Sequence, residues 1–276
     1  MSKKVRPPLF HLSLMDSIQW LRRLNSESVD CVFTDPAYES LEKHRAIGTT
    51  TRLQDWFPIF RNARYSDLMA ELYRVLRCDR HCYVMSDEDT LYTLRPAAED
   101  AGFKWWKSVV WDKETIGNGY HYRNSHEFVV FLEKGKRPLR DRTRVRSVVG
   151  PSTVPGTKPI RGGKYPTQKP VALIRHFLHQ SVDPGMVVID PFMGSGATLV
   201  AGVDEGCEVW GTDIEQRSVD LASGRLMSMK CARRGDPSLL MAVEVELDAV
   251  VVRPELDPDL DEGHAAQAKL FSDEPR

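Results

Sequence analysis

The segment that most constrains the fold is residues 186–198, where a short strand leads into a loop that contains two glycines. The apolar, β-branched run 187–189 predicts a buried strand, which ends at Asp190. Gly194 and Gly196 follow, and a helix-compatible run comes directly after them. Glycines at such a turn let the backbone approach a ligand closely. The segment therefore predicts the strand, loop and helix of an α/β nucleotide-type site.

The rest of the chain alternates between strand and helix patterns. With 276 residues and 41% hydrophobic content, it can bury one large core. Alternation of this kind predicts an α/β fold, with a doubly wound, mainly parallel sheet and helices on both faces. No apolar run approaches the roughly 18 residues of a membrane span, and the basic N-terminus lacks the apolar stretch of a signal peptide. We expect a helix over 65–77 and strands over 82–85, 105–111, 127–132 and 209–213.

A second strand pattern, over residues 29–34, ends in the tetrapeptide Asp35-Pro36-Ala37-Tyr38. A four-residue pattern at a strand end can also be an ordinary turn. Together with the glycine loop, the tetrapeptide becomes a more specific sign of a functional site, because residues at the carboxyl ends of neighbouring parallel strands meet at one edge of the sheet.

These two segments resemble motif IV (residues 35–38) and motif I (residues 190–196) of the amino-group DNA methyltransferases. Motif IV usually reads Asp-Pro-Pro-Tyr, and Ala37 replaces its second proline. The tetrapeptide precedes the loop, which is the order of the permuted, beta-class members of this N6-adenine/N4-cytosine family. The resemblance covers nearly all of residues 9–229. It implies a methyltransferase fold with a small inserted recognition region, S-adenosylmethionine as cofactor and DNA as substrate.

The resemblance also implies roles for the tetrapeptide. The Asp35 carboxylate and the Pro36 carbonyl would accept hydrogen bonds from the exocyclic amino group, which frees its lone pair for attack on the methyl group. Tyr38 would offer a ring face to a base that has left the duplex stack. Asp at the first position mostly accompanies adenine and Ser mostly cytosine, so N6 of adenine is favoured and N4 of cytosine remains the alternative. A cytosine-C5 enzyme would need a nucleophilic Cys, typically after Pro, and the chain has no Pro-Cys pair.

For the cofactor, the resemblance points to four parts of the chain. Asp16 would approach the adenine, residues 165–170 resemble motif X at the methionine end, and an acid about 20 residues after the loop suits the ribose hydroxyls. For that last role Asp213 is favoured and Glu215 is its rival. The predicted cofactor residues are Asp16, Lys169, Pro170, Asp190, Phe192, Gly194, Ser195, Gly196, Thr198 and Asp213. No metal is expected, because the thiols of Cys78 and Cys82 lack a second ligand pair.

Charge is unevenly distributed along the chain. The formal net charge is −1, but residues 235–276 hold 11 acidic and 3 basic side chains. Residues 133–169 carry 11 Lys or Arg against 2 acids, a density that favours phosphate binding, although a solvated loop is the alternative. The expected DNA-binding residues are Lys43, Arg45, Arg52, Arg140, Arg142, Arg144, Arg146 and Lys164.

These patterns divide the chain into a methyltransferase domain (1–234) and an acidic, partly disordered extension (235–276). Within the domain, we expect 39–64 to form a mobile loop over the substrate groove or a purely structural excursion. Residues 135–164 are expected to be a short target-recognition segment.

The extension ends with Gln267-Ala268-Lys269-Leu270-Phe271, which resembles the peptide by which bacterial proteins dock on the replication sliding clamp. Chance, or a helix packed on the body, is the alternative.

Three classes of function remain to be compared. A DNA amino-methyltransferase of a bacterial or phage restriction–modification system, cytoplasmic and nucleoid-associated, explains both motifs and the basic segment. A methyltransferase for another substrate leaves the basic segment unexplained, and an inactive DNA-binding module leaves Asp35 unexplained. A homodimer is compatible with the resemblance, since dimers are frequent in the family.

Overall fold

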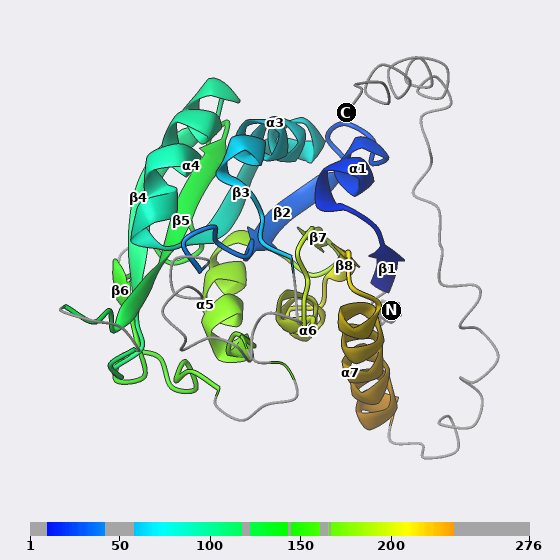
Figure 1. The fold of residues 1–276 in the computed structure, drawn as a ribbon. Coiled ribbons are helices and arrows are strands. Elements are labelled where there is room, and N and C mark those ends of the chain that lie inside the picture. The colour runs from blue at the N-terminus through cyan, green and yellow to red at the C-terminus, as the bar shows by residue number, and fades with distance from the viewer. Residues whose placement is uncertain are drawn as a thin grey trace, which may run out of the picture.

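The computed structural model describes residues 10–41, 58–117, 122–142, 145–160, 165 and 167–234, and the structural statements below concern these residues. They form one eight-stranded sheet in the order β1-β8-β7-β2-β3-β5-β4-β6 (Figure 1). The strands are β1 (Phe10–Leu14), β2 (Val29–Thr34), β3 (Leu76–Ser86), β4 (Lys104–Asp112), β5 (His126–Lys134), β6 (Val148–Val149), β7 (Val187–Asp190) and β8 (Glu208–Asp213). The helices are α1 (Ser17–Arg22), η1 (Asn62–Arg64), α3 (Tyr65–Val75), α4 (Glu88–Asp100), α5 (Val171–Ser181), α6 (Ala197–Asp204) and α7 (Gln216–Arg234).

The sheet is mainly parallel, as the sequence predicted. Each pair from β1 across β8, β7 and β2 to β3 is parallel, and so is the pair β4–β6. Only β5 runs the other way, antiparallel to both β3 and β4. The α/β class and the doubly wound arrangement are therefore confirmed.

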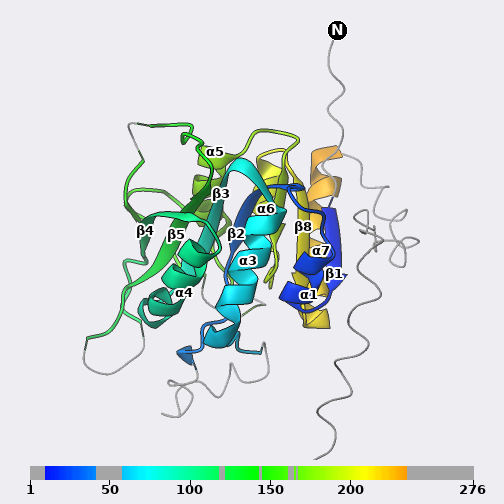
Figure 2. The same ribbon diagram turned by 90° about the horizontal axis from the view of Figure 1, so that it is seen from above.

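Helices cover both faces of the sheet, with α1, α3 and α4 on one and α5, α6 and α7 on the other (Figure 2). One apolar cluster joins the first group to the sheet through Leu21, Leu68 and Leu94. The other joins the second group through Phe177 and Leu199. Burial of these side chains is the main stabilising contribution, at roughly 1.5–3 kcal/mol for each large apolar residue.

The helix expected over 65–77 ends at Val75, and strand β3 begins at Leu76, before the predicted strand 82–85. The backbone changes to an extended conformation at Leu76, with ψ of 131°. The predicted boundary was therefore wrong by two residues on the helix side and six on the strand side.

A buried carboxylate accounts for the early start of β3. Asp30 of β2 has only 7% of its side chain exposed, and it accepts hydrogen bonds from Arg77 at 2.6 Å and Arg80 at 3.0 Å. Because a buried charge needs partners, Arg77 and Arg80 are held beside β2 in an irregular part of β3, where the pairing with β2 passes from Leu76 to His81. The sequence pattern of 77–81 is polar and gives no strand signal, which explains the error.

The topology brings the two motif segments together. β7 and β2 are neighbours, but β7 leads to α6 on one face and β2 leads toward α3 on the other. A crevice opens at the carboxyl ends of such a strand pair, where ligands bind in open α/β sheets. The ends of β2, β7 and β8 are occupied by Asp35, Asp190 and Asp213 respectively.

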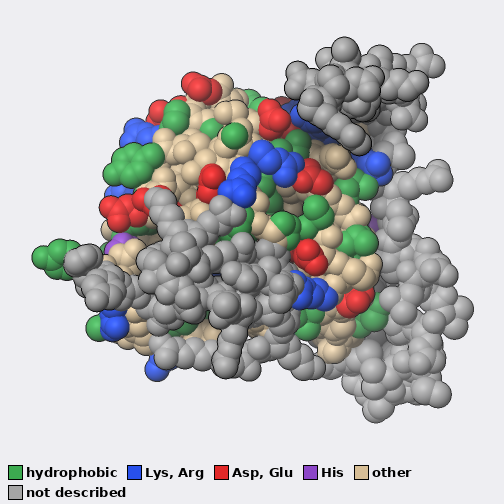
Figure 3. Space-filling view, in the orientation of Figure 1, with side chains coloured by type: hydrophobic (Ala, Val, Ile, Leu, Met, Phe, Trp, Pro, Cys, Tyr) green, Lys and Arg blue, Asp and Glu red, His purple; other side chains and the backbone are tan. Residues whose placement is uncertain are grey.

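Within the described part of the chain, no helix is long and apolar enough to span a bilayer. On the face shown in Figure 3, basic and acidic side chains are interspersed among the described residues rather than gathered into one patch.

Candidate active site

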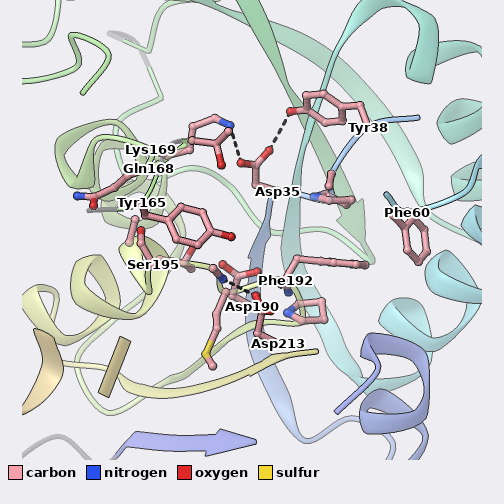
Figure 4. Close-up of a pocket in the computed structure, with 18 of the residues that line it drawn as sticks. Asp35, Tyr38, Phe60, Tyr165, Gln168, Lys169, Asp190, Phe192, Ser195 and Asp213 are labelled. Carbon is pink, nitrogen blue, oxygen red and sulfur yellow. Dashed lines mark hydrogen bonds and ion pairs between the residues drawn. The ribbon is translucent and has the colours of Figure 1, made fainter. Parts of the chain in front are cut away.

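A cavity of about 410 Å³ opens at the carboxyl edge of the sheet (Figure 4). This volume lies in the range of small-molecule and cofactor sites. Its walls combine both motif segments with parts of the chain that the sequence did not single out. The lining includes Asp16, Asp35, Pro36, Tyr38, Phe60, Arg64, Trp111, Lys113, Glu127, Tyr165, Lys169, Ile174, Asp190, Phe192, Gly194, Ser195, Thr198 and Asp213.

The carboxylate of Asp35 is held from both sides. Tyr38 donates its hydroxyl to Oδ1 at 2.9 Å, and Lys169 places Nζ 2.5 Å from Oδ2 (Figure 4). The Asp35 side chain is 24% exposed, toward the cavity. The carbonyl of Ala37 accepts a hydrogen bond from the Phe60 amide at 2.9 Å, which fixes the strand-end turn. Asp35 and Pro36 thus line the cavity, and their catalytic roles stay predictions.

Tyr38 and Lys169 have contacts that the sequence did not predict. Tyr38 was expected to offer a ring face, and here its side chain is only 6% exposed with its hydroxyl on Asp35. Lys169 was expected at the cofactor's methionine end, and here it contacts the catalytic-motif carboxylate instead of standing free in the cavity.

The glycine loop has the backbone that a close ligand approach requires. Gly194 has φ of 48° and Gly196 has φ of 74°, both in the left-handed region that favours glycine. A Cβ at Gly196 would lie 2.8 Å from Cβ of Ala222, so this glycine also permits α6 and α7 to pack. Ser195 is 3% exposed and accepts hydrogen bonds from Arg225 through its carbonyl at 2.6 Å and its hydroxyl at 3.2 Å.

Asp190 lies beneath this loop, 3% exposed. It accepts hydrogen bonds from the Phe192 amide at 3.0 Å and the Thr34 hydroxyl at 2.9 Å, and its carboxylate also bonds the Thr198 side chain. Burial raises the pKa of Asp190 to about 7, although these hydrogen bonds oppose the shift. Asp190 therefore shapes the loop as much as it lines the cavity.

Asp213, at the end of β8, lines the cavity, whereas its rival Glu215 does not. Asp213 accepts the amide of Gly194 at 2.9 Å and the amide of Glu215 at 2.9 Å, one on each oxygen. Burial raises the pKa of Asp213. Each carboxylate oxygen has a second lone pair, which can accept a hydroxyl donor, and this is the chemistry that a ribose requires.

The predicted adenine-side residue, Asp16, is already paired. It caps α1 by accepting the amide of Ile18 at 3.1 Å, and both its oxygens lie 2.8 Å from Arg64. Arg64 also lies over the ring of Phe60, 5.1 Å from its centroid. Phe60 in turn meets Phe192 edge-on at 4.9 Å. The described end of the segment 39–64 therefore packs against the glycine loop, whereas residues 42–57 lie outside the described residues.

The remaining predicted cofactor residues lie behind the cavity wall. Pro170 is the N-cap residue of α5, and Gly196 is the N-cap residue of α6. Neither lines the cavity.

The sequence missed two charged residues of the site, Glu127 and Lys113. Glu127 lies 3.4 Å from Lys169 and accepts a hydrogen bond from Lys113 at 3.2 Å. Glu127 begins the apolar strand that was predicted, but its place depends on the direction of β5, because only an antiparallel strand starts at this edge of the sheet. That direction left no signal in the sequence.

The predicted DNA-binding residues divide into three groups. Arg140 is engaged within the protein, where its guanidinium donates to the carbonyls of His179 and Val182 at the end of α5 and pairs with Asp183 at 2.9 Å. Arg142 and Arg146 are exposed. Lys43, Arg45, Arg52, Arg144 and Lys164 lie outside the described residues, as do 235–276 with the peptide Gln267–Phe271.

The residues at the cavity fit S-adenosylmethionine. The left-handed Gly194 allows a close backbone approach, and a strand-end carboxylate can accept hydroxyl donors. Phe192 and Ile214 supply an apolar wall for a flat ring. These groups would bind the cofactor without forming a covalent bond to it.

A doubly wound sheet with a glycine loop and strand-end acids at one cavity is the arrangement of a nucleotide-type site, and the S-adenosylmethionine-dependent methyltransferases are one class with this arrangement. Residues 29–224 match the N6/N4 methyltransferase family of DNA methylases. The chain belongs to this family of amino-group DNA methyltransferases, whose cofactor is S-adenosylmethionine.

Two curated relatives are Type II methyltransferases. M.HinfI of Haemophilus influenzae is 26% identical over 242 residues, covering 78% of this chain and 67% of the relative. M2.DpnII of Streptococcus pneumoniae is 25% identical over 239 residues, covering 76% of this chain and 87% of the relative.

Solved structures share the fold. The complex of M1.HpyAVI with SAM superposes with a TM-score of 0.58 at 18% identity, covering 79% of this chain and 100% of that one. TTHA0409 from Thermus thermophilus, complexed with S-adenosyl-L-methionine, gives 0.58 at 19% identity, covering 79% and 93%. The PvuII DNA methyltransferase, described as cytosine-N4-specific, gives 0.59 at 13% identity, covering 79% and 88%.

Proposed function

We propose that this DNA amino-methyltransferase acts on N6 of an adenine that has been flipped out of double-stranded DNA. The observation that carries the proposal is the position of Asp35: its carboxylate lines the same cavity as the glycine loop and Asp213. A methyl donor bound over the loop and a base bound at Asp35 would then share one cavity, which holds the reactants in an oriented pair.

The residues of the tetrapeptide would act on the target amino group. One amino hydrogen is donated to Asp35 and the other to the Pro36 carbonyl, so the nitrogen lone pair is no longer fully delocalised into the ring. The cofactor supplies an electrophilic methyl group. Transfer of that methyl group to the nitrogen would leave S-adenosylhomocysteine in the cavity, and the nitrogen would give up one proton to solvent to recover its neutral amine.

The choice of adenine rests on the first residue of the tetrapeptide, Asp35, because Asp at this position mostly accompanies adenine in the family. The second candidate is N4 of cytosine, since the same two acceptors can serve either amino group. The PvuII enzyme of similar fold is cytosine-N4-specific by its name.

Methylation-aware sequencing distinguishes the two bases. DNA from cells that express the chain, compared with DNA from cells that express Asp35→Ala, should carry N6-methyladenine in one short sequence context. N4-methylcytosine in a fixed context would favour the second candidate, and no modified base would oppose DNA as the substrate.

DNA binding is proposed to involve the segment 135–164, through the exposed Arg142 and Arg146. Contacts of this kind with phosphates position a duplex without reading its sequence. A substrate other than DNA is the more distant alternative. In that case, when DNA, RNA and protein are offered to the enzyme together, labelled methyl groups would appear in the RNA or the protein.

A separate hypothesis concerns the C-terminal peptide Gln267–Phe271, proposed to recruit a cytoplasmic, nucleoid-associated enzyme to newly replicated DNA. In this hypothesis, Gln267 bonds the pocket rim of a sliding clamp, and Leu270 and Phe271 fill its apolar pocket. A synthetic peptide covering 265–276 should bind the host clamp at about micromolar strength. Binding should be lost with Phe271→Ala, and an absence of binding by the unchanged peptide would reject the hypothesis.

A further inference from the structure

Four ionisable side chains of alternating charge form a row along the cavity: Lys113, Glu127, Lys169 and Asp35. The successive distances between their charged atoms are 3.2 Å, 3.4 Å and 2.5 Å. None of the four is more than 24% exposed at the side chain. Figure 4 shows the end of the row, where Lys169 points at Asp35.

The row is assembled from four separate parts of the sheet edge. Asp35 follows β2, Lys113 follows β4, Glu127 lies near the start of β5, and Lys169 directly precedes Pro170, the N-cap of α5. These positions meet because β5 is antiparallel, so that its start lies beside the ends of β3 and β4, one strand away from the end of β2. Each of the four residues therefore lies in, or within two residues of, a strand or the helix α5.

The charges in the row balance one another. Burial raises the pKa of Asp35, with Lys169 lowering it and Glu127 raising it further. Burial also raises the pKa of Glu127, but Lys169 and Lys113 outweigh that effect and the pKa of Glu127 is lowered. For Lys169, burial disfavours the cation, yet its two acidic neighbours raise the pKa overall. The surroundings thus favour the charged forms of Lys169 and Glu127, whereas their net effect on Asp35 is a raised pKa.

A catalytic carboxylate in this position must stay ionised, because a protonated oxygen cannot accept the hydrogen bond of the target amino group in the same way. Tyr38 occupies Oδ1 and Lys169 occupies Oδ2, which fixes the plane of the carboxylate. Lys169 is itself fixed between Asp35 and Glu127.

We propose that Lys169 is a positioning residue that keeps Asp35 ionised and oriented, and that Glu127, held by Lys113, positions Lys169. The assignment rests on the proposed catalytic role of Asp35. It replaces the expectation that Lys169 binds the methionine end of the cofactor.

The two roles of Lys169 predict different results for the charge-removing variant Lys169→Gln. If Lys169 acts on Asp35, methyl transfer slows most at low pH, because Asp35 loses the cation that favours its ionised form. If Lys169 binds the cofactor carboxylate, cofactor affinity falls and the shape of the pH profile stays the same.

Glu127→Gln provides the opposite perturbation in the same row. It removes an anion near Asp35 but keeps the shape of the side chain, so the acidic limb of the pH profile should move to lower pH. If the row had a purely structural role, Lys169→Gln and Glu127→Gln would not move the acidic limb of the pH profile in opposite directions.

The experiment measures single-turnover methyl transfer to DNA from about pH 5 to about pH 9, with cofactor affinity by calorimetry, for the full chain and the variants Lys169→Gln, Lys169→Arg and Glu127→Gln. We expect the acidic limb to move up for Lys169→Gln, with a loss of roughly tenfold in rate at low pH, and to move down for Glu127→Gln. Lys169→Arg should recover part of the rate, since it keeps the charge. Cofactor affinity should stay within about threefold in every variant.

Two results would overturn the proposal. The first is a loss of cofactor affinity of about tenfold or more in Lys169→Gln, with the acidic limb of its pH profile unchanged. The second is an unchanged acidic limb in both Lys169→Gln and Glu127→Gln. If Lys169→Gln does not fold, Glu127→Gln and Lys169→Arg still decide between the outcomes. Substantial activity in Asp35→Ala would instead contradict the proposed function, so the two failures are distinguishable.

Discussion

Thr34 donates a hydrogen bond of 2.9 Å from its hydroxyl to Oδ1 of Asp190, and this bond joins the end of β2 to the end of β7. Both side chains are buried, at 0% and 3% exposure. The residues are 156 positions apart, yet they couple the strand that carries Asp35 to the strand that carries the glycine loop. The positions of Asp35 and the glycine loop relative to each other are thus set by the sheet itself.

The protonation of Asp190 gives a prediction for stability. Its pKa is raised from 3.8 to about 7, so the folded protein keeps this proton in a pH window where the unfolded chain has lost it. Unfolding then releases a proton, and the contribution of Asp190 to the free energy of unfolding falls as pH rises through that window. The slope is at most about 1.4 kcal/mol for each pH unit.

Asp190→Asn lacks this titration. The stability of the unchanged protein relative to this variant should therefore be greater near pH 5 than near pH 8, as measured by urea unfolding at about these two values. A difference that is constant, or that grows with pH, would show that Asp190 is ionised in the folded protein.

The glycine loop gives a prediction with a matched control. Alanine at Gly196 adds both left-handed strain and a Cβ 2.8 Å from that of Ala222. Alanine at Gly185, where φ is 89°, adds strain alone, because nothing lies within 4 Å of its Cβ. Gly185→Ala should cost about 1 kcal/mol, and Gly196→Ala about 1–3 kcal/mol more.

Because α6 must shift to relieve that contact, Gly196→Ala should also weaken cofactor binding, and Gly185→Ala should leave it unchanged. Thermal unfolding and calorimetry measure the two effects. Equal stability losses in the two variants would mean that the contact between α6 and α7 relaxes freely.

The arginines of segment 135–164 give a prediction for DNA binding. Charge reversal of Arg142 and Arg146 together should weaken binding to all duplex sequences. It should also reduce the salt dependence, by about one unit of slope for each phosphate that the variant no longer binds. The folded state should be as stable as before, because both side chains are exposed.

Arg140→Glu is the contrasting variant. Arg140 holds the carbonyls of His179 and Val182 and pairs with Asp183, so its reversal should lower the unfolding temperature. Salt-dependent binding curves and thermal unfolding separate the two sites. If the Arg142 and Arg146 reversal leaves affinity unchanged, this part of the segment faces away from DNA.

The sequence predicted those parts of the site that follow from strand ends. Asp35, Asp190 and Asp213 each terminate an apolar run, and parallel strands bring such ends together, so their convergence was predictable. The contacts of Lys113 and Glu127 were not, since an apolar run such as 127–132 does not reveal its direction in the sheet.

The charge pattern of the sequence likewise did not reveal which partners the individual charged residues contact. The basic segment 133–169 predicts phosphate binding, but the same guanidinium groups can satisfy carbonyls at a helix end, as Arg140 does at the end of α5. In the same way, Asp16 was predicted to contact the cofactor. In the structure it pairs with Arg64, which belongs to a segment without a periodic pattern, so its position could not be predicted from the sequence.

The most direct test of the account is methyl transfer from labelled S-adenosylmethionine to duplex DNA by Asp35→Ala, measured beside cofactor affinity. Asp100→Ala, which removes an exposed acid at the end of α4, is the control and should keep full activity. We predict that Asp35→Ala abolishes transfer while cofactor affinity stays within about threefold, because the carboxylate acts on the target amino group. Substantial turnover by Asp35→Ala would contradict the account.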